Sequence, residues 1–526
     1  MSTVAPVVWT SAGAVSGAWR AHRSADGSTS RAAIFLGIPY AEPPVGERRF
    51  LAPVPRGPWE GVRPATLHGA TPQRRSPWPD AFVPEPSIPG DDLLTLDVGT
   101  PDPSPDAGMP VLVYLHGGGF VAGSHASPWY GGQAFHRDGV VTVTPSYRLG
   151  FDGFGWIDGA PLNRGVLDWL LALAWVHENI RAFGGDPAKV TIAGQSAGGA
   201  AVMRLLTMPA AQGLFRAVLA LSPADTPVRA ERARAVTVAG AARLGIAPDL
   251  DGLRSLTEAQ VLDAQSFEEP TPEGQDPLAG TFGDDLVLSP VIDGDLVPAR
   301  IDEAIAAGVG AGVALLVGAT AHEFDLALAD APAALVAGDP HEILARQGVP
   351  AGLHDELLAR VPGADGRRAA GQAVTQAVFR RHVGRWAGLR ARGGASPRTW
   401  AYDFRWASPV DGIAGHCLDL PFGFDILRDP TAVRRAGTDA PQEIADAVHG
   451  DWLALIRDGR VDATVHAEGR ATIVYGEPVR DVRPGYAFEE RLAVATSAAG
   501  VDDAAEDPVV EGEGGGAAED APATSA

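Results

Sequence analysis

The sequence predicts an α/β fold with a large, mostly parallel central sheet that is flanked by helices and carries helical insertions. Two observations favour it. Short apolar runs rich in β-branched residues alternate with helical or loop segments, which is the alternation expected of such a sheet. One of these runs, at 190–193, leads into Gly-Gln-Ser-Ala-Gly at 194–198, and an alanine-rich helical pattern follows directly.

Six short apolar runs are predicted to be strands of this sheet. They lie at 111–115, 140–144, 190–193, 217–221, 313–317 and 399–404. Apolar residues at helical spacing predict a helix over 165–182, and 197–206 is the predicted helix behind the Gly-x-Ser-x-Gly turn. Strand-like runs continue on both sides of the helix-rich stretch 225–400. We therefore interpret that stretch as insertions into one domain, which spans residues 1–497.

Ser196 occupies the apex of the predicted strand-to-helix turn. A residue at such an apex is strained and needs neighbours two positions away that lack a Cβ, as Gly194 and Gly198 do. The turn exposes the serine oxygen and directs the next backbone N–H at a reacting carbonyl. A chance Gly-x-Ser-x-Gly is not rare in a chain with 64 glycines. The strand before it and the helix after it therefore carry the argument.

A glycine-rich loop follows the predicted strand at 111–115. It reads His-Gly-Gly-Gly-Phe at 116–120. Glycines at a strand end let backbone N–H groups approach a ligand closely, and in serine hydrolases such a loop supplies donors of the oxyanion hole. A turn without a chemical role is the alternative. The position of the loop upstream of Ser196 favours the oxyanion hole.

A serine hydrolase of this chain order needs an acid and then a histidine after the serine. Glu323 lies six residues beyond the predicted strand at 313–317, where the loops at the carboxyl ends of the strands gather, and it is the predicted acid. The predicted base is His416, in a loop after the strand at 399–404.

Two other histidines, His322 and His177, are each followed by a glutamate, as in a zinc-protease motif, but they are not candidates for the base. His322 is next to Glu323, and His177 lies in a predicted helix. Neither builds His-Glu-x-x-His, because Leu326 and Arg181 stand where the second histidine would be needed. The spacing excludes that kind of zinc protease site.

Charge and composition exclude several partners. With 42 basic and 65 acidic residues the formal net charge is −23, which argues against nucleic acid and anionic membrane surfaces. No segment approaches the roughly 18 uncharged apolar residues that span a bilayer, and the N-terminus lacks the pattern of a secretory signal. Cys417 is the one cysteine, so no intrachain disulfide can form. We expect a cytoplasmic protein.

The end of the chain, residues 498–526, is predicted to be a disordered acidic tail. Eight acidic residues and no basic residue follow Arg491. Interleaved glycine, alanine and proline leave this stretch too little apolar surface to fold. A specific docking segment is the alternative.

These features resemble the type-B carboxylesterase/cholinesterase family of α/β-hydrolases, over most of residues 5–490. Further motifs occur in the order of that family: Phe-Leu-Gly-Ile-Pro-Tyr-Ala at 35–41, Tyr-Arg-Leu-Gly at 147–150, Phe-Gly-Gly-Asp-Pro at 183–187 and Val-Ile-Asp-Gly at 291–294. The sequence looks most similar to the bacterial p-nitrobenzyl-esterase-like members. The secreted animal members rely on disulfides, which this chain cannot form with its single cysteine.

The resemblance implies an α/β-hydrolase fold and a serine carboxylic-ester hydrolase. Such an enzyme acts through an acyl-enzyme on small to medium hydrophobic esters and needs no metal or organic cofactor. Carried over by position, the resemblance implies Ser196 as nucleophile, Glu323 as acid and His416 as general base. The oxyanion-hole N–H groups fall on three backbone positions, those of Gly118, Gly119 and Ala197.

Other functions stay open at this point. A carbamate or amide hydrolase would use the same three side chains, and sequence does not separate the leaving groups. A catalytically silent interaction domain of the same fold is the non-enzyme alternative, which the complete serine, glutamate and histidine set disfavours. We expect a small-molecule ester as the partner and a monomer or homodimer.

One departure from the family pattern concerns the general base. Gln195 stands where the family usually has a glutamate, directly before the nucleophile. Glutamine has nearly the same shape without the charge, so we expect the pKa of His416 to be lower than beside a glutamate.

The loops at 60–95 and 265–290 are predicted to line the pocket.

Overall fold

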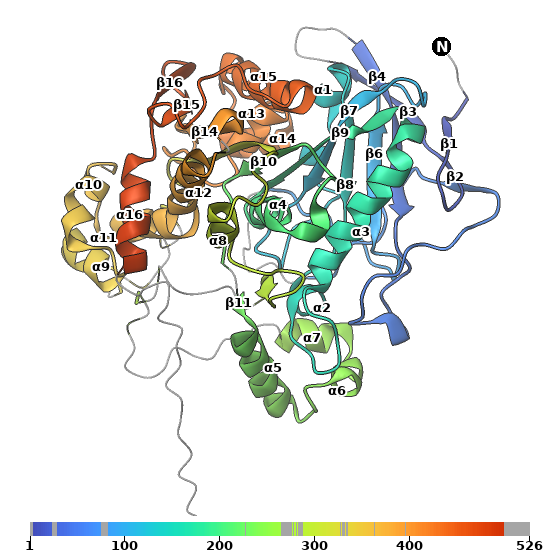
Figure 1. The fold of residues 1–526 in the computed structure, drawn as a ribbon, viewed down its shortest axis with the longest axis horizontal. Coiled ribbons are helices and arrows are strands. Elements are labelled where there is room, and N and C mark those ends of the chain that lie inside the picture. The colour runs from blue at the N-terminus through green and yellow to red at the C-terminus, as the bar shows by residue number, and fades with distance from the viewer. Residues whose placement is uncertain are drawn as a thin grey trace, which may run out of the picture.

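The computed structural model describes residues 4–498, apart from residues 24–28, 75–82, 227, 265–275, 277, 280, 282–287, 327, 329–331, 333–334, 362 and 395. Its centre is an 11-stranded sheet with the strand order β16-β15-β14-β13-β10-β9-β7-β8-β6-β4-β3 (Figure 1). In chain order these strands are β3 (Ala18–Arg23), β4 (Thr29–Pro39), β6 (Thr95–Thr100), β7 (Met109–Leu115), β8 (Val141–Pro145), β9 (Gly185–Gln195), β10 (Ala217–Leu221), β13 (Ala314–Thr320), β14 (Thr399–Phe404), β15 (Ala471–Tyr475) and β16 (Arg480–Pro484).

The centre of the sheet is parallel and its two sides are antiparallel. All neighbouring strands from β15 to β8 pair in parallel. β16 pairs antiparallel with β15, and β6, β4 and β3 continue from β8 in antiparallel pairs. In register, Leu221 at the end of β10 lies between Gln195 and Gly318. The carboxyl ends of β9, β10 and β13 therefore lie side by side, at the edge where open α/β sheets bind ligands.

Each face of the parallel centre carries its own core, because side chains alternate between the faces. On β7, Val111 and Val113 belong to one core, while Leu112 and Tyr114 belong to the other. The first core is covered by α3 (Arg164–Asn179), α4 (Ala197–Thr207) and α12 (Arg381–Arg392), and the second by α1 (Gln133–Arg137), α13 (Asp419–Gly423), α14 (Pro430–Ala436) and α15 (Gln442–Asp458). Burial on both faces explains why the central strands are continuous apolar runs.

Two helical insertions connect neighbouring strands of the sheet. Between β10 and β13 the chain forms α5 (Ala230–Leu244), α6 (Leu250–Arg254), α7 (Glu258–Ala264) and α8 (Ile301–Ala306). Between β13 and β14 it forms α9 (Pro340–Arg346), α10 (His354–Leu358) and α11 (Gly366–Thr375) before α12. In Figure 1, α5 to α7 project below the sheet and α9 to α11 lie at its left edge, beside α16 (Ala487–Ala498). The remaining short elements are α2 (Gly150–Phe154), β1 (Val7–Trp9), β2 (Ala14–Ser16), β5 (Val62–Pro64), β11 (Val228–Arg229) and β12 (Val291–Ile292).

The predicted α/β fold with a mostly parallel sheet and helical insertions is confirmed. All six predicted strands are present, and they are β7, β8, β9, β10, β13 and β14. One end differs: β13 continues to Thr320, so Glu323 stands three residues beyond the strand and not six. The predicted helix at 165–182 is α3 followed by the 3-10 helix Ile180–Phe183. The strands β3, β4, β6, β15 and β16 were not predicted.

The predicted domain boundary at 497 stays a prediction, although both insertions join strands of the same sheet. Ala498 ends α16, and the rest of the predicted tail, 499–526, lies outside the described residues. Among the described helices, none combines the length and the apolar character that crossing a bilayer requires.

Candidate active site

Ser196 lies at a sharp turn between β9 and α4. Its backbone has φ 60° and ψ −124°, a conformation that residues other than glycine rarely adopt. A Cβ on Gly194 would lie 2.2 Å from the Gly198 carbonyl oxygen, and a Cβ on Gly198 would lie 2.1 Å from that of Leu115. Such strain costs on the order of 1–3 kcal/mol and persists only where the surroundings impose it. The turn is therefore the one that the sequence predicts, and both of its glycines are sterically required.

Glu323 and His416 meet beyond the carboxyl ends of β13 and β14. Nδ1 of His416 is hydrogen-bonded to Oε2 of Glu323. The other carboxylate oxygen accepts from the Thr320 N–H (2.7 Å), and the His416 N–H donates to the Glu323 carbonyl (3.0 Å). Both side chains are buried. The carboxylate thus holds the proton of the imidazole on Nδ1 and leaves Nε2 unprotonated.

The surroundings of His416 set its pKa. Burial lowers the pKa, but the Cys417 sulfur and the Glu323 carboxylate raise it by more, so the pKa lies above its ordinary value. The rings of Phe324 and Phe379 pack on the imidazole, with centroids 4.9 and 4.7 Å away. Sequence reasoning missed both phenylalanines. The position of Phe324 directly after the predicted acid was the one signal that could have indicated it.

The glycine-rich loop after β7 presents backbone N–H groups near Ser196. Gly118 has φ +117°, and a Cβ there would lie 2.2 Å from the Ala122 carbonyl oxygen, so only glycine fits. Within the described residues, no hydrogen bond uses the N–H of Gly118 or Gly119 as a donor. Ala197 is the first residue of α4, where N–H groups have no acceptor inside the helix. Within the described residues, the N–H groups of Gly118 and Gly119 are therefore left without a protein acceptor, and Ala197 N–H has none inside its helix.

Ser196 and His416 line one cavity. The other lining residues are Val83, Pro84, Glu85, Gly117, Gly118, Gly123, Ser124, Tyr130, Gln195, Phe324 and Cys417. Val83, Pro84 and Glu85 belong to the predicted pocket loop at 60–95. Most of the second predicted loop, 265–290, lies outside the described residues, and none of its described residues lines this cavity. The predicted nucleophile and base thus face a common space.

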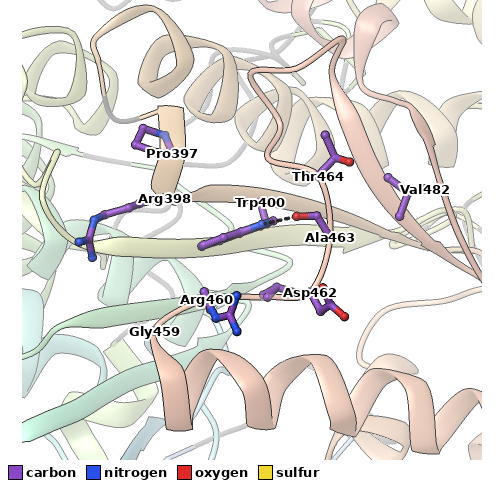
Figure 2. Close-up of a pocket in the computed structure, with 10 residues that line it drawn as sticks. Pro397, Arg398, Trp400, Gly459, Arg460, Asp462, Ala463, Thr464 and Val482 are labelled. Atoms are coloured by element: carbon purple, nitrogen blue, oxygen red, sulfur yellow. Dashed lines mark hydrogen bonds between the residues drawn. The ribbon is translucent and has the colours of Figure 1, made fainter.

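A second hollow lies away from these residues, between β14, β16 and the loop after α15 (Figure 2). Its lining residues include Arg398, Arg460 and Asp462, and the Trp400 ring donates to the Ala463 carbonyl (3.0 Å). None of its lining residues is a serine, cysteine or histidine. The candidate active site is therefore the cavity at Ser196.

Neither of the other two histidines singled out in the sequence belongs to the site. Nδ1 of His322 accepts from the Ala414 N–H (3.2 Å), and the His322 N–H donates to the Ala414 carbonyl (3.0 Å). These bonds join the loop after β13 to the loop that carries His416. Burial lowers the pKa of His322 to about 4. His177 is exposed on α3, and neither histidine lines the cavity.

Gln195 contacts the predicted base directly. Its amide nitrogen lies 3.1 Å from Nε2 of His416, and both side chains are buried. The sequence-based hypothesis that residue 195 tunes His416 required this proximity. An amide N–H that donates to Nε2 stabilises the neutral imidazole, which is the form that a general base needs.

Comparison with known proteins places this chain in a family. The model of the carboxylesterase family matches residues 4–459. The para-nitrobenzyl esterase of Bacillus subtilis (strain 168) is 31% identical over 464 residues, which cover 83% of this chain and 90% of that protein. The phenmedipham hydrolase of Pseudarthrobacter oxydans is 31% identical over 489 residues, 88% of this chain and 95% of that protein.

Solved structures agree with these relatives. The carboxylesterase EST55 of Geobacillus stearothermophilus superposes with a TM-score of 0.76 at 31% identity, over 92% of this chain and 99% of that one. A PNB esterase superposes with a TM-score of 0.77 at 28% identity, over 93% and 99%. The fold is that of an α/β-hydrolase. The chain belongs to the carboxylesterase family, and it is a carboxylic-ester hydrolase.

Proposed function

We propose that Ser196, His416 and Glu323 form the catalytic triad of a serine esterase. The observation that carries this proposal is the hydrogen bond between His416 Nδ1 and Glu323, made beside a cavity that Ser196 and His416 both line. The bond fixes the imidazole so that Nε2 is the nitrogen available to the serine hydroxyl.

The reaction then runs in two halves. His416 Nε2 takes the proton of Ser196 Oγ as that oxygen attacks the ester carbonyl, and the same nitrogen passes the proton to the departing alcohol. Water attacks the acyl-enzyme in the second half, with His416 again as base. Glu323 stabilises the imidazolium at both stages.

The backbone N–H groups of Gly118, Gly119 and Ala197 hold the oxyanion of both tetrahedral intermediates. Removing one such donor typically costs about 3–4 kcal/mol of transition-state stabilisation. Because these donors are fixed by the elbow and by the glycine loop, they need no reorganisation when the charge develops. Neither half of the reaction requires a cofactor.

The lining of the cavity supports hydrophobic esters of small to medium size as substrates. Val83, Pro84, Tyr130 and Phe324 supply apolar wall, and Glu85 is the one carboxylate among the lining residues described. Because Arg74 pairs with this carboxylate, the wall adds no net charge, which suits neutral esters.

A substrate panel tests this proposal. We expect p-nitrophenyl esters with short acyl groups to be hydrolysed with a higher kcat/KM than aryl carbamates or anilides. A higher kcat/KM for carbamates or anilides would reassign the enzyme to the alternative class with the same triad. No turnover of any member would contradict the proposed triad.

We also propose a cytoplasmic location and a monomeric or homodimeric state. The single cysteine, which is buried, fits a reducing compartment. Fractionation and sedimentation measurements test the two statements separately.

Replacing Gln195 by glutamate should shift the pH profile. A carboxylate about 3 Å from Nε2 favours the imidazolium, so it raises the pKa of His416 further. The base must be neutral, so the acidic limb of kcat/KM should move to higher pH. The measurement is kcat/KM against pH with one neutral ester.

Gln260→Glu is the matched control for this experiment. Gln260 is exposed on α7 and accepts from the Thr257 N–H through its side-chain oxygen, which glutamate also provides. This variant should keep the natural profile. Coincident acidic limbs for Gln195→Glu and the natural enzyme would show that residue 195 does not tune the base.

A further inference from the structure

Three side chains with metal-ligating atoms gather beside the active-site cavity, and the ester chemistry uses none of them. They are His68, Asp97 on β6, and His125 in the segment after the oxyanion glycines. One ligand atom from each lies within 4.8 Å of those of the other two. Gly123 and Ser124, just before His125, line the cavity. The cluster therefore borders the substrate site without belonging to it.

Within the described residues, His125 is the member of the cluster that makes no side-chain hydrogen bond. Its side chain is 1% exposed, and within the described residues neither ring nitrogen makes a hydrogen bond. Its Nε2 points toward the cluster and lies 3.9 Å from Oδ2 of Asp97, too far for a hydrogen bond. Buried polar groups are nearly always satisfied, so this imidazole indicates a ligand between the two side chains.

Asp97 is oriented to serve both histidines. Its Oδ1 accepts from the Gly37 N–H (2.8 Å), and its Oδ2 lies 2.7 Å from Nδ1 of His68. Two ligands of a tetrahedral zinc ion lie about 3.3 Å apart, given metal–ligand distances near 2.0–2.1 Å. The separation of Asp97 Oδ2 from His68 Nδ1 (2.7 Å) is shorter than that value, and its separation from His125 Nε2 (3.9 Å) is longer. A small shift of Oδ2 away from His68 and toward His125 would satisfy both.

The electrostatics of the site permit a cation. Asp97 supplies the carboxylate of the cluster, and the two histidines ligate through unprotonated ring nitrogens. The charge of Arg74 is balanced by Glu85, whose carboxylate lies 3.3 Å from the guanidinium. The ring of His68, whose side chain is 35% exposed, leaves an entry path.

We propose that His68, Asp97 and His125 bind one divalent transition-metal ion of the zinc class, with water in the remaining position. Two imidazoles and one carboxylate suit zinc better than the hard ions calcium and magnesium, which prefer oxygen ligands. The bound ion joins the segment at His68, the strand β6 and the wall of the cavity. It stabilises the fold there and takes no part in ester cleavage.

Zinc content and thermal stability test the proposal on the full-length protein. The chain is treated with a chelator, dialysed, and titrated with zinc sulfate. We expect one zinc per chain by elemental analysis and a Tm that rises by several degrees. Asp97→Asn keeps the acceptor for the Gly37 N–H and removes the ligating charge, so it should bind no zinc and show no rise.

His341→Asn is the matched control, because His341 is an exposed histidine that also contacts two carboxylates, those of Asp339 and Asp355. It should retain both the zinc and the rise in Tm. The partly exposed His68 gives a second cluster variant, His68→Asn, for the case in which Asp97→Asn does not fold. Cobalt chloride should give a visible band typical of four-coordinate Co²⁺ with the natural chain and not with the cluster variant.

Anomalous scattering at the zinc edge locates the ion directly. A peak between the three side chains supports the proposal. The proposal is overturned if chelated natural protein takes up no zinc, or if the cluster variants bind it as well as the control. A water molecule between His125 and Asp97, with no anomalous peak, would also overturn it.

Discussion

Ser196→Ala should abolish ester turnover, with a loss in kcat of about 10⁶-fold, because removing the nucleophile of a comparable triad costs that much. The fold should survive the change. Alanine fits the same turn, and the bond from the Ser196 N–H to the Leu221 carbonyl (3.0 Å) does not require the hydroxyl. Steady-state kinetics with a short-chain p-nitrophenyl ester measures the loss.

Covalent labelling identifies the nucleophile independently of turnover. A sulfonyl fluoride or an organophosphate should modify Ser196 alone, as seen by intact and peptide mass spectrometry. Ser104→Ala is the control, because Ser104 is an exposed serine whose hydroxyl donates to Asp102 (2.5 Å) outside the cavity. This variant should be labelled at Ser196 and should hydrolyse the ester at the same rate as the natural enzyme. Full activity in Ser196→Ala would refute the triad.

The strands that the sequence predicted are those with apolar residues on both faces. β7 and β10 read as continuous apolar runs because helices cover both sides of them. β6 is equally buried, but Asp97 and Gly99 interrupt its apolar pattern. Asp97 can be buried because it accepts a hydrogen bond from the distant Gly37 N–H. No local pattern carries that information. β15, Ala-Thr-Ile-Val-Tyr, is a buried apolar run that local pattern alone could have identified.

The candidate site likewise contains some features that local sequence predicts and others that depend on tertiary contacts. Ser196 and the oxyanion glycines are local features, since strain and close backbone approach demand glycine at fixed spacings. Glu323 was predicted correctly although the end of β13 was misplaced by three residues. The prediction required only that the acid lie in the loop after the strand, so an error of a few residues in the strand end did not change it. The packing of Phe379 on His416 and the approach of His68 to His125 depend on tertiary contacts. Spacing along the chain gives no signal for either.

Asp168→Ala should cost about 3–5 kcal/mol of unfolding free energy, the typical loss when one partner of a buried ion pair is removed. Asp168 is fully buried, and its two oxygens accept from Nε and a terminal nitrogen of Arg148 at 2.8 and 2.7 Å. Oδ2 also accepts from the Arg148 N–H (3.0 Å). The same carboxylate faces a second buried cation, Arg164, whose pKa is lowered to about 9 by burial and then by Arg148. Without Asp168, Arg148 loses its paired carboxylate, and Asp152 remains as an opposing charge for both guanidinium groups.

The oxyanion loop should loosen in this variant as well. The motif that contains Arg148 supports that loop, since the Tyr147 hydroxyl donates to the His116 carbonyl (2.8 Å) and the Gly150 N–H donates to the Phe120 carbonyl (2.7 Å). We therefore expect kcat to fall along with stability, even where the variant is still folded. If kcat stays unchanged in folded Asp168→Ala, the motif that contains Arg148 does not support the oxyanion loop.

Urea unfolding measures the loss of stability, and Glu356→Ala is the matched control. Glu356 pairs with Arg491 at the surface, where both side chains are about half exposed. Exposed pairs of this kind contribute about 1 kcal/mol or less, so the control should unfold close to the natural protein. If Asp168→Ala also unfolds within about 1 kcal/mol of it, the bonds from Arg148 to the Leu51 and Arg164 carbonyls must satisfy the guanidinium on their own. The buried pair would then specify the position of the loop without stabilising the fold.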